Sequence, residues 1–132
     1  MAIQTNTVFL AGPPLTCPMD LFGQKTDALP LADEILYRYT ADRRLELASD
    51  FVGSVSSSDI VTTAETVYIV RRDGFNIGTI TFPIGGIVGV FADDTEIGDH
   101  VILTGQSITV VAPAVPDGTH ARISWTFQAT FN

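Results

Sequence analysis

The most regular hydrophobic pattern lies near the end of the chain, from Ala121 to Ala129. Apolar residues occupy every second position of this segment, and polar residues occupy the positions between them. A period of two places the apolar side chains on one face of a β-strand, and one buried plus one solvated face is typical of an antiparallel sheet. We therefore expect a strand here, with Trp125 in its buried row.

Three further strand-like runs follow one another in the middle of the chain. The first two, at 61–72 and 76–82, are separated by Asp73-Gly74. This dipeptide suits a two-residue hairpin turn, because glycine accepts a positive φ. A break at 83–86 precedes the third run, at 86–92, which is again apolar. The three runs predict a β-meander.

The segment from Leu31 to Leu47 fits two patterns. As a helix, it would place Leu31, Ile35 and Tyr39 at helical spacing. As strands, it would form two short runs separated by a turn at 41–42. The density of β-forming residues and the lack of clear helix ends favour strands.

Two more short strands are predicted at 100–103 and 107–112, and a serine-rich loop at 50–59 with a short strand edge at 51–52. Along the chain, about eight to ten short strands recur at regular intervals, which is the signature of an all-β sandwich. We therefore predict an all-β, antiparallel, jelly-roll-like β-sandwich over residues 31–132.

Residues 1–30 differ from the rest of the chain. One strand is expected at Thr5–Leu10, after which prolines, including Pro18, interrupt regular structure. Residues 20–30 are rich in turn-forming residues. We interpret 1–30 as an extended N-terminal arm that lies over the domain or over a neighbouring subunit. The alternative is an ordinary N-terminal strand followed by a long loop.

Composition narrows the functional classes. The 132 residues suit one domain, with 45% apolar and 17% charged residues. Fifteen acids against seven bases give a net charge of −8, and Lys25 is the only lysine, so we expect no binding to nucleic acid. The acidic balance also opposes binding to anionic membranes. The longest weakly polar run, 82–92, is too short for membrane insertion. The start of the chain does not match a signal peptide.

Candidate catalytic groups are few. His100 and His120 sit beside loops without partners at metal-binding spacing, so we expect both at the solvent edge. The serines at 54–58 are expected in a flexible loop, and no nucleophile-elbow motif is present. The single cysteine, Cys17, is expected to be an inert thiol. We predict no catalytic residue, no cofactor and no enzymatic activity.

Two features of the sequence are candidate binding sites. Asp93, Asp94, Thr95, Glu96 and Asp99 form an acidic turn that could bind Ca²⁺, but their spacing does not match an EF-hand loop. A solvated turn without a metal is the expectation.

Exposed aromatic residues can bind sugars by stacking. Tyr37, Tyr39 and Phe75 are the candidates, whereas Trp125 is expected in the core. None of these residues is specific enough to assign a binding site.

One part of the sequence resembles a group of tailed-bacteriophage virion proteins. In that group a hairpin of the form I-x-x-N/D-G-x-x-I-G-T-I-T-F is followed by G-D-x-L-x-V-x-A-P and then by D-x-T-x-A-x-I-x-x-T. The resemblance covers about residues 34–127, and 103–108 lengthen the path between the second motif's two halves. The matching residues are Ile69, Asp73, Gly74, Ile77, Gly78, Thr79, Ile80, Thr81, Phe82, Gly98, Asp99, Ala112, Pro113, Asp117, Thr119, Ala121, Ile123 and Thr126.

The resemblance implies a small β-sandwich in the virion, often a trimer, assembled in the host bacterial cytoplasm. We expect a non-enzymatic structural protein, a trimeric component of the tail or tail tip that serves in assembly and host-surface attachment. Its partners would be other copies of itself, other virion proteins and a host cell-surface glycan. The alternatives are a capsid decoration protein that stabilises the head, and a carbohydrate-binding module.

Overall fold

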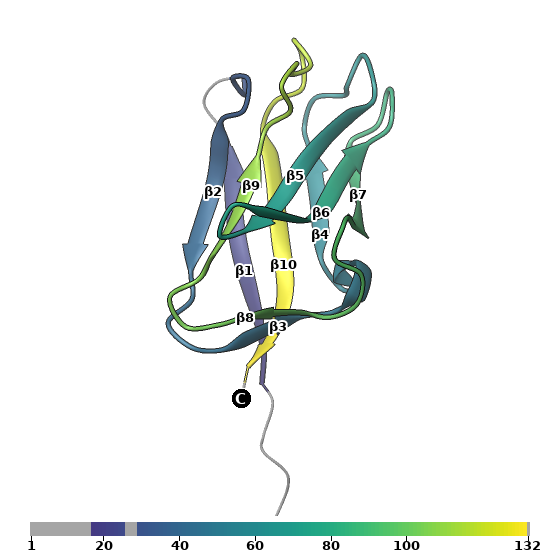
Figure 1. The fold of residues 1–132 in the computed structure, drawn as a ribbon. Helices are drawn as coiled ribbons and strands as arrows, with labels where there is room; N and C mark the ends of the chain where they lie inside the picture. Colours follow the sequence, from purple (N-terminus) through teal and green to yellow (C-terminus); the bar gives the residue numbers. More distant parts are fainter. Residues whose placement is uncertain (1–16, 26–28, 132) are drawn as a thin grey trace, which may run out of the picture.

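In the described part of the chain, the regular structure is antiparallel β-sheet apart from one short 3₁₀ helix, as the alternating pattern predicted (Figure 1). The computed structural model describes residues 17–25 and 29–131, without the side chain of Cys17. Segment 31–47 forms strands, so the helical alternative was wrong. The described elements are β1 (Cys17–Lys25), β2 (Ile35–Thr40), β3 (Leu45–Leu47), the 3₁₀ helix η1 (Ser49–Phe51), β4 (Val55–Ser58), β5 (Thr66–Arg72), β6 (Phe75–Phe82), β7 (Val88–Asp93), β8 (His100–Ile102), β9 (Ser107–Val111) and β10 (Ile123–Phe131).

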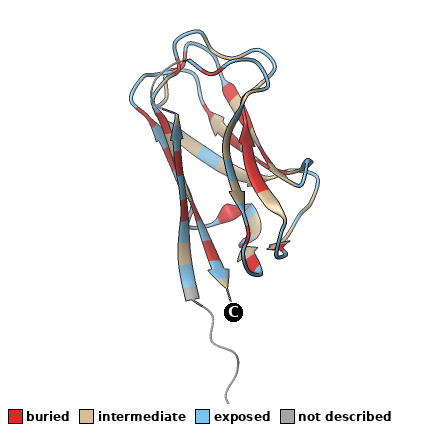
Figure 2. Cartoon of the chain, turned by 90° about the vertical axis from the view of Figure 1, so that its left-hand side faces the viewer, coloured by how far each residue is buried: buried red, intermediate tan, exposed pale blue. Residues whose placement is uncertain are grey.

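The strands form one hydrogen-bonded path in the order β2-β9-β5-β6-β7-β4-β10-β3-β8, and β1 pairs with β10. Strands β1 and β10 lie behind β9 and β5 in Figure 1. Seen from the side, the path is folded back on itself, with buried residues on the facing sides (Figure 2). The core therefore lies between two halves of one folded path of strands.

The predicted hairpin between β5 and β6 is confirmed. Asp73 and Gly74 both have positive φ, 48° and 85°, and Arg72 pairs with Phe75 on either side of them. Positive φ at both central residues gives the turn a twist that matches its strands, which explains the need for glycine. Phe75 is 73% exposed at this tip, as expected for a surface aromatic.

Small residues let the path bend between β4 and β7. Ser56 lies opposite Gly89, and its buried hydroxyl donates to the backbone oxygen of Ser124 at 2.7 Å. A Cβ on Gly89 would lie 2.7 Å from Cγ2 of Ile80, closer than real contacts allow. The flexible loop predicted at 54–58 was wrong, because Val55–Ser58 forms β4, where Ser56 and Ser58 are small enough to face inward at the bend.

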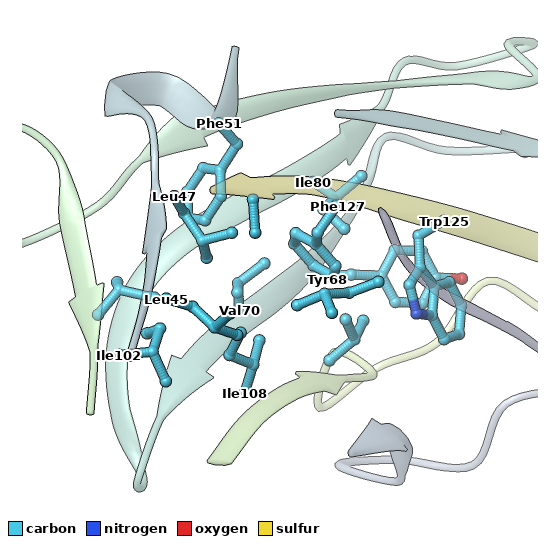
Figure 3. Packing of buried hydrophobic residues seen from close by; sticks show 14 of the residues in the cluster. Leu45, Leu47, Phe51, Tyr68, Val70, Ile80, Ile102, Ile108, Trp125 and Phe127 are labelled. Atoms are coloured by element: carbon cyan, nitrogen blue, oxygen red, sulfur yellow. The ribbon is translucent and has the colours of Figure 1, made fainter. Parts of the chain in front are cut away.

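The core is built from the facing rows of the two halves (Figure 3). Trp125 and Phe127 of β10 are buried, as their alternation predicted, and Tyr37 of β2 packs edge-on against Trp125 with ring centroids 5.9 Å apart. Gly23 of β1 faces the same rings. A Cβ there would lie 2.3 Å from Cδ1 of Tyr37, so glycine is required for this packing.

Strand β1 is the main difference from the expected fold. It pairs with β10 along its whole length, from Cys17 opposite Phe131 to Lys25 opposite Ile123. The interpretation of residues 20–30 as a turn-rich segment was therefore wrong up to residue 25. Pro18 is accommodated because β1 has no second strand partner among the described residues, and proline is tolerated at a sheet edge. The strand predicted at 5–10 lies outside the described residues.

Candidate functional site

Four loops lie together at the upper end of the molecule in Figure 1. They connect β1 to β2, β4 to β5, β6 to β7, and β9 to β10. Their described residues are 29–34, 59–65, 83–87 and 112–122. We call these four ranges together the apical platform. Much of their surface is exposed (Figure 2).

The carboxylate of Asp117 joins two loops of the apical platform. One oxygen accepts hydrogen bonds from the backbone N–H and hydroxyl of Thr63, at 2.8 and 2.7 Å, and from the N–H of Ala64 at 3.0 Å. The other accepts from the N–H and hydroxyl of Thr119, at 2.8 and 2.7 Å, and from the N–H of His120 at 3.1 Å. Burial alone would raise the pKa of Asp117, but these bonds outweigh it and hold the pKa well below its usual range.

Further hydrogen bonds connect all four loops. The hydroxyl of Thr119 donates to the backbone oxygen of Val61 at 3.2 Å. Each of the four loops is thus bonded to another, which fixes the apical platform before any partner binds. Four further bonds of 2.7–3.2 Å link Gly85 N to Thr62 O, Thr62 Oγ1 to Pro83 O, Asp33 N to Pro113 O, and Ala112 N to Glu34 O.

Apolar side chains project from this fixed base. Leu31, Ile84 and Val115 come from three different loops and are 71%, 71% and 87% exposed. Val61 and Ile87 are less exposed, at 47% and 44%. Isolated exposed aliphatic residues are ordinary, but a group on one end of a molecule indicates an interaction surface.

His120 lies beneath the apical platform and is fully buried, so its predicted place at the solvent edge was wrong. Its Nδ1 is 2.7 Å from the hydroxyl oxygen of Tyr68, and its ring centroid is 4.4 Å from that of Phe82. Burial lowers the pKa of His120, against the attraction of the Asp117 charge, and burial raises the pKa of Tyr68. His120 is therefore held neutral as part of the core.

His100, at the opposite end, is also fully buried, contrary to expectation. Its Nε2 is 2.7 Å from Oδ1 of Asp93, and its Nδ1 is 3.3 Å from Oε1 of Glu96. Arg72 binds both oxygens of Glu96, at 2.9 and 2.6 Å. The ring of His100 stacks on Phe51 with centroids 4.9 Å apart. Polar partners on both ring nitrogens explain why this histidine can be buried.

The acidic turn is occupied by donors from the chain itself. Asp93 accepts hydrogen bonds from the hydroxyl of Ser49 at 2.9 Å, the N–H of Asp50 at 2.8 Å and the N–H of Gly98 at 3.0 Å. Burial opposes ionisation, but these bonds and the one with His100 lower the pKa of Asp93 to about 2. Within the described residues, no group of three or more His, Cys, Asp or Glu side chains could hold a metal.

The order of these groups decides what they can do chemically. The carboxylate of Asp93 stands between Ser49 and His100. In a hydrolytic triad the imidazole stands between the serine and the acid, and takes the proton of the hydroxyl. Here Ser49 donates to a carboxylate of low pKa, an arrangement that fixes the η1 turn without activating the serine. Asp50 and Phe51 of that turn both have φ of 54°, a strained conformation that these contacts hold in place.

The other predicted candidates lie apart from the apical platform. Tyr37 is half-buried in the core, where burial and the Tyr39 charge raise its pKa to about 12. Phe75 stands alone on its hairpin, and Trp125 is buried. The thiol of Cys17 lies outside the described side chains. Tyr37 thus packs on Trp125 inside the core, apart from Phe75, and these residues form no shared exposed aromatic surface.

A shallow hollow of about 270 Å³ lies near the η1 turn. Glu46, Asp99 and Gln128 contribute polar groups to its lining, and Val52 contributes an apolar one. The N–H of Ser49 already occupies one oxygen of Asp99, at 2.9 Å. Pro18, Ala48 and Thr130 complete the lining. With Val52 as its one large aliphatic side chain, the hollow offers a smaller apolar surface than the apical platform does.

Sequence reasoning missed the role of Asp117. A usable signal was present, because an aspartate followed by glycine and threonine often bonds to the backbone just after it. The pairing with Thr63 had no local signal, since the two residues are 54 positions apart.

Known protein families give no match to this chain, and neither do curated protein sequences. Across residues 17–25 and 29–131, no helix is long and apolar enough to cross a bilayer. The functional inference therefore rests on the fold, the apical platform and the motif residues.

Proposed function

We propose that this chain is a non-enzymatic structural protein of a tailed-phage virion. In this proposal it is a homotrimeric component of the tail or tail tip, and it serves in assembly and host-surface attachment. The observation that carries the proposal is the apical platform: four loops, bonded to one another, that expose aliphatic side chains. Such a surface binds by shape and burial of apolar area.

The physical basis is pre-organisation. Binding costs free energy when loops must first be ordered, and rigid loops reduce that cost. Asp117 and Thr119 hold the loops in place through several hydrogen bonds, which include bonds to Thr63 and Val61 of a neighbouring loop. The net charge of −8 keeps such a protein soluble while its aliphatic residues are exposed.

The residues that resemble phage virion proteins have structural roles here, which supports the comparison. Asp117 and Thr119 build the apical platform. Gly78 of β6 leaves room for the ring of Phe51, since a Cβ there would lie 2.2 Å from Cε2 of that ring. These roles belong to fold and assembly, in keeping with a structural protein.

The composition of the apical platform favours this proposal over a carbohydrate-binding module. No phenylalanine, tyrosine or tryptophan occurs in residues 29–34, 59–65, 83–87 or 112–122. Sugar-binding surfaces commonly use aromatic rings as stacking platforms, and the exposed side chains here are aliphatic. Contacts with another protein suit them better.

Labelling of intact phage particles tests the proposal. Gold-labelled antibodies against the chain should mark the tail or its tip in electron micrographs. Labelling of the head shell alone would replace the tail assignment by capsid decoration. Absence of the chain from purified particles would overturn the virion proposal. Light scattering of the purified protein would test the trimer directly.

A further inference from the structure

We infer that the apical platform docks a protein of different sequence, whose contact surface is apolar and surrounded by lysine or arginine side chains. This inference rests on the proposed function and names the partner chemistry of the same surface. It follows from two features of the apical platform: its exposed aliphatic side chains, and the carboxylates at the ends of its loops, which surround them.

The aliphatic tips set the centre of the contact. Leu31, Ile84 and Val115 project from three loops that are bonded to neighbouring loops, so their spacing is fixed. None of the three belongs to the hydrophobic core cluster. They are free to enter an apolar surface on a partner, where burial of each side chain favours association.

The charges of the apical platform have one dominant sign. Asp33, Asp59 and Glu65 are exposed at the ends of their loops, and their carboxylates have no hydrogen-bond or ion-pair partner in the described part of the chain. Asp117 is occupied within the apical platform. The only arginine of the four loops is Arg122, and they contain no lysine.

The only lysine of the chain does not offset the negative charge of these carboxylates. Lys25, at the end of β1, forms an ion pair with Glu34 at 3.0 Å, so the two charges offset each other. The three free carboxylates therefore give the apical platform a negative rim. A complementary partner must place positive charges around its apolar centre, since like charges across an interface oppose association.

Charge also separates this partner from the two obvious competitors. A second copy would bring an equally acidic rim against Asp33, Asp59 and Glu65, and both copies carry a net charge of −8. An anionic bilayer would be repelled for the same reason. Homotypic contacts of a trimer should therefore use another face, which leaves the apical platform for the different protein.

Chemical-shift mapping on the ¹⁵N-labelled full chain tests the inference. The probe is a synthetic amphipathic helical peptide of leucine and lysine, and a leucine–glutamate peptide is its matched control. We expect the lysine peptide to shift the amide signals of residues 29–34, 59–65, 83–87 and 112–122. We also expect its binding to weaken with added salt. The glutamate peptide should shift none of them. Equal shifts with both peptides, shifts centred elsewhere or no shifts would overturn the inference.

Variants separate the tips from the rim. Ile84→Ser combined with Val115→Ser should lower the affinity for the lysine peptide by about tenfold or more, corresponding to about 1.4 kcal/mol. Asp59→Asn combined with Glu65→Gln should reduce the salt dependence. Phe75→Ser, which removes an equally exposed apolar residue outside the apical platform, should leave the affinity unchanged. An equal loss in the Phe75 variant would contradict the assignment.

The two competing partners, a second copy of the chain and an anionic bilayer, are tested by following the same amide signals. Shifts of the apical platform on concentrating the protein alone would show that a second copy docks there and would overturn the inference. Shifts with phosphatidylcholine–phosphatidylglycerol vesicles would overturn it in favour of a membrane surface. Absence of the chain from virions would end the proposed function alone, because the peptide measurement uses only the purified protein.

Discussion

The carboxylate of Asp117 accepts hydrogen bonds from both the backbone N–H and the hydroxyl of Thr63, at 2.8 and 2.7 Å. These two residues are 54 positions apart in the chain. Their contact, more than any property of a single loop, turns connections between strands into a fixed surface. The junction between loops 59–65 and 112–122 should therefore depend mainly on this one side chain.

Replacing Asp117 by asparagine tests that dependence. The amide keeps one acceptor oxygen, but its NH₂ group faces donors such as the N–H of Thr63 and leaves them without an acceptor. Asp117→Asn should lower the free energy of unfolding by about 1–3 kcal/mol. Urea denaturation measures the change. Asp59→Asn, on an exposed carboxylate without a described partner, should stay within about 0.5 kcal/mol of wild type.

The bonded loops should also be protected from hydrogen exchange. The amides of Thr63, Ala64 and Gly85 donate to acceptors in other loops, so their exchange requires a local opening of the apical platform. Exchange followed by NMR should show these amides slowed, and Asp117→Asn should release the first two selectively. Fast exchange of all three in the wild type would show that the loops are not fixed.

Much of the strand pattern could be predicted from the sequence, because it is local. The alternation around Trp125 predicts a strand, and Asp73-Gly74 predicts a hairpin turn, each from a few neighbouring residues. Strand β1 could not be predicted from a local pattern of this kind. Its buried row contains Gly23, which leaves space for Trp125, so the expected apolar residue is missing at that position.

The burial of the histidines was unpredictable for a related reason. His100 is compensated by Asp93 and Glu96, and His120 by Tyr68, which lies 52 positions away. A residue beside a loop in sequence can be in the core when such partners reach it. Tyr68 meets His120 only in the folded chain. Glu96 and Asp93 stand only four and seven residues before His100, but nothing in the sequence shows that these carboxylates turn inward to the ring.

Stability should fall in acid, with two separable contributions. The pKa of Asp93 is about 2 in the fold, below its ordinary value of 3.8. Its contribution to stability is therefore present above pH 3.8 and is lost as the pH falls toward 2. The pKa of His120 is lowered below 6.5, so the unfolded chain binds a proton that the folded chain does not, and stability starts to fall once the pH drops through 6.5.

The histidine contribution can be isolated by substitution. His120→Gln has no group that titrates at this position, so its free energy of unfolding should decline less than that of wild type between about pH 7 and pH 5. Urea denaturation across this range measures both slopes. Identical slopes would show that His120 is not held neutral in the fold.

Two glycines provide a matched test of packing. A Cβ on Gly78 would lie 2.2 Å from the ring of Phe51, whereas one on Gly118 would meet no atom within 4 Å. Gly78→Ala should lower the free energy of unfolding by about 1–3 kcal/mol, because the ring must move. Gly118→Ala should change it by less than about 0.5 kcal/mol. Thermal denaturation of both variants gives the comparison, and equal effects would contradict the packing described here.

Photo-crosslinking in intact phage particles tests the central claim most directly. A benzophenone side chain at position 115 places the reactive group on the apical platform, and the same group at position 75 is the control on an exposed hairpin. We predict that position 115 crosslinks to a virion protein of different sequence, at a segment containing apolar and basic residues, and that position 75 does not. Incorporation of the chain into particles without a crosslink from position 115, or a crosslink from there to another copy of the same chain, would contradict the account.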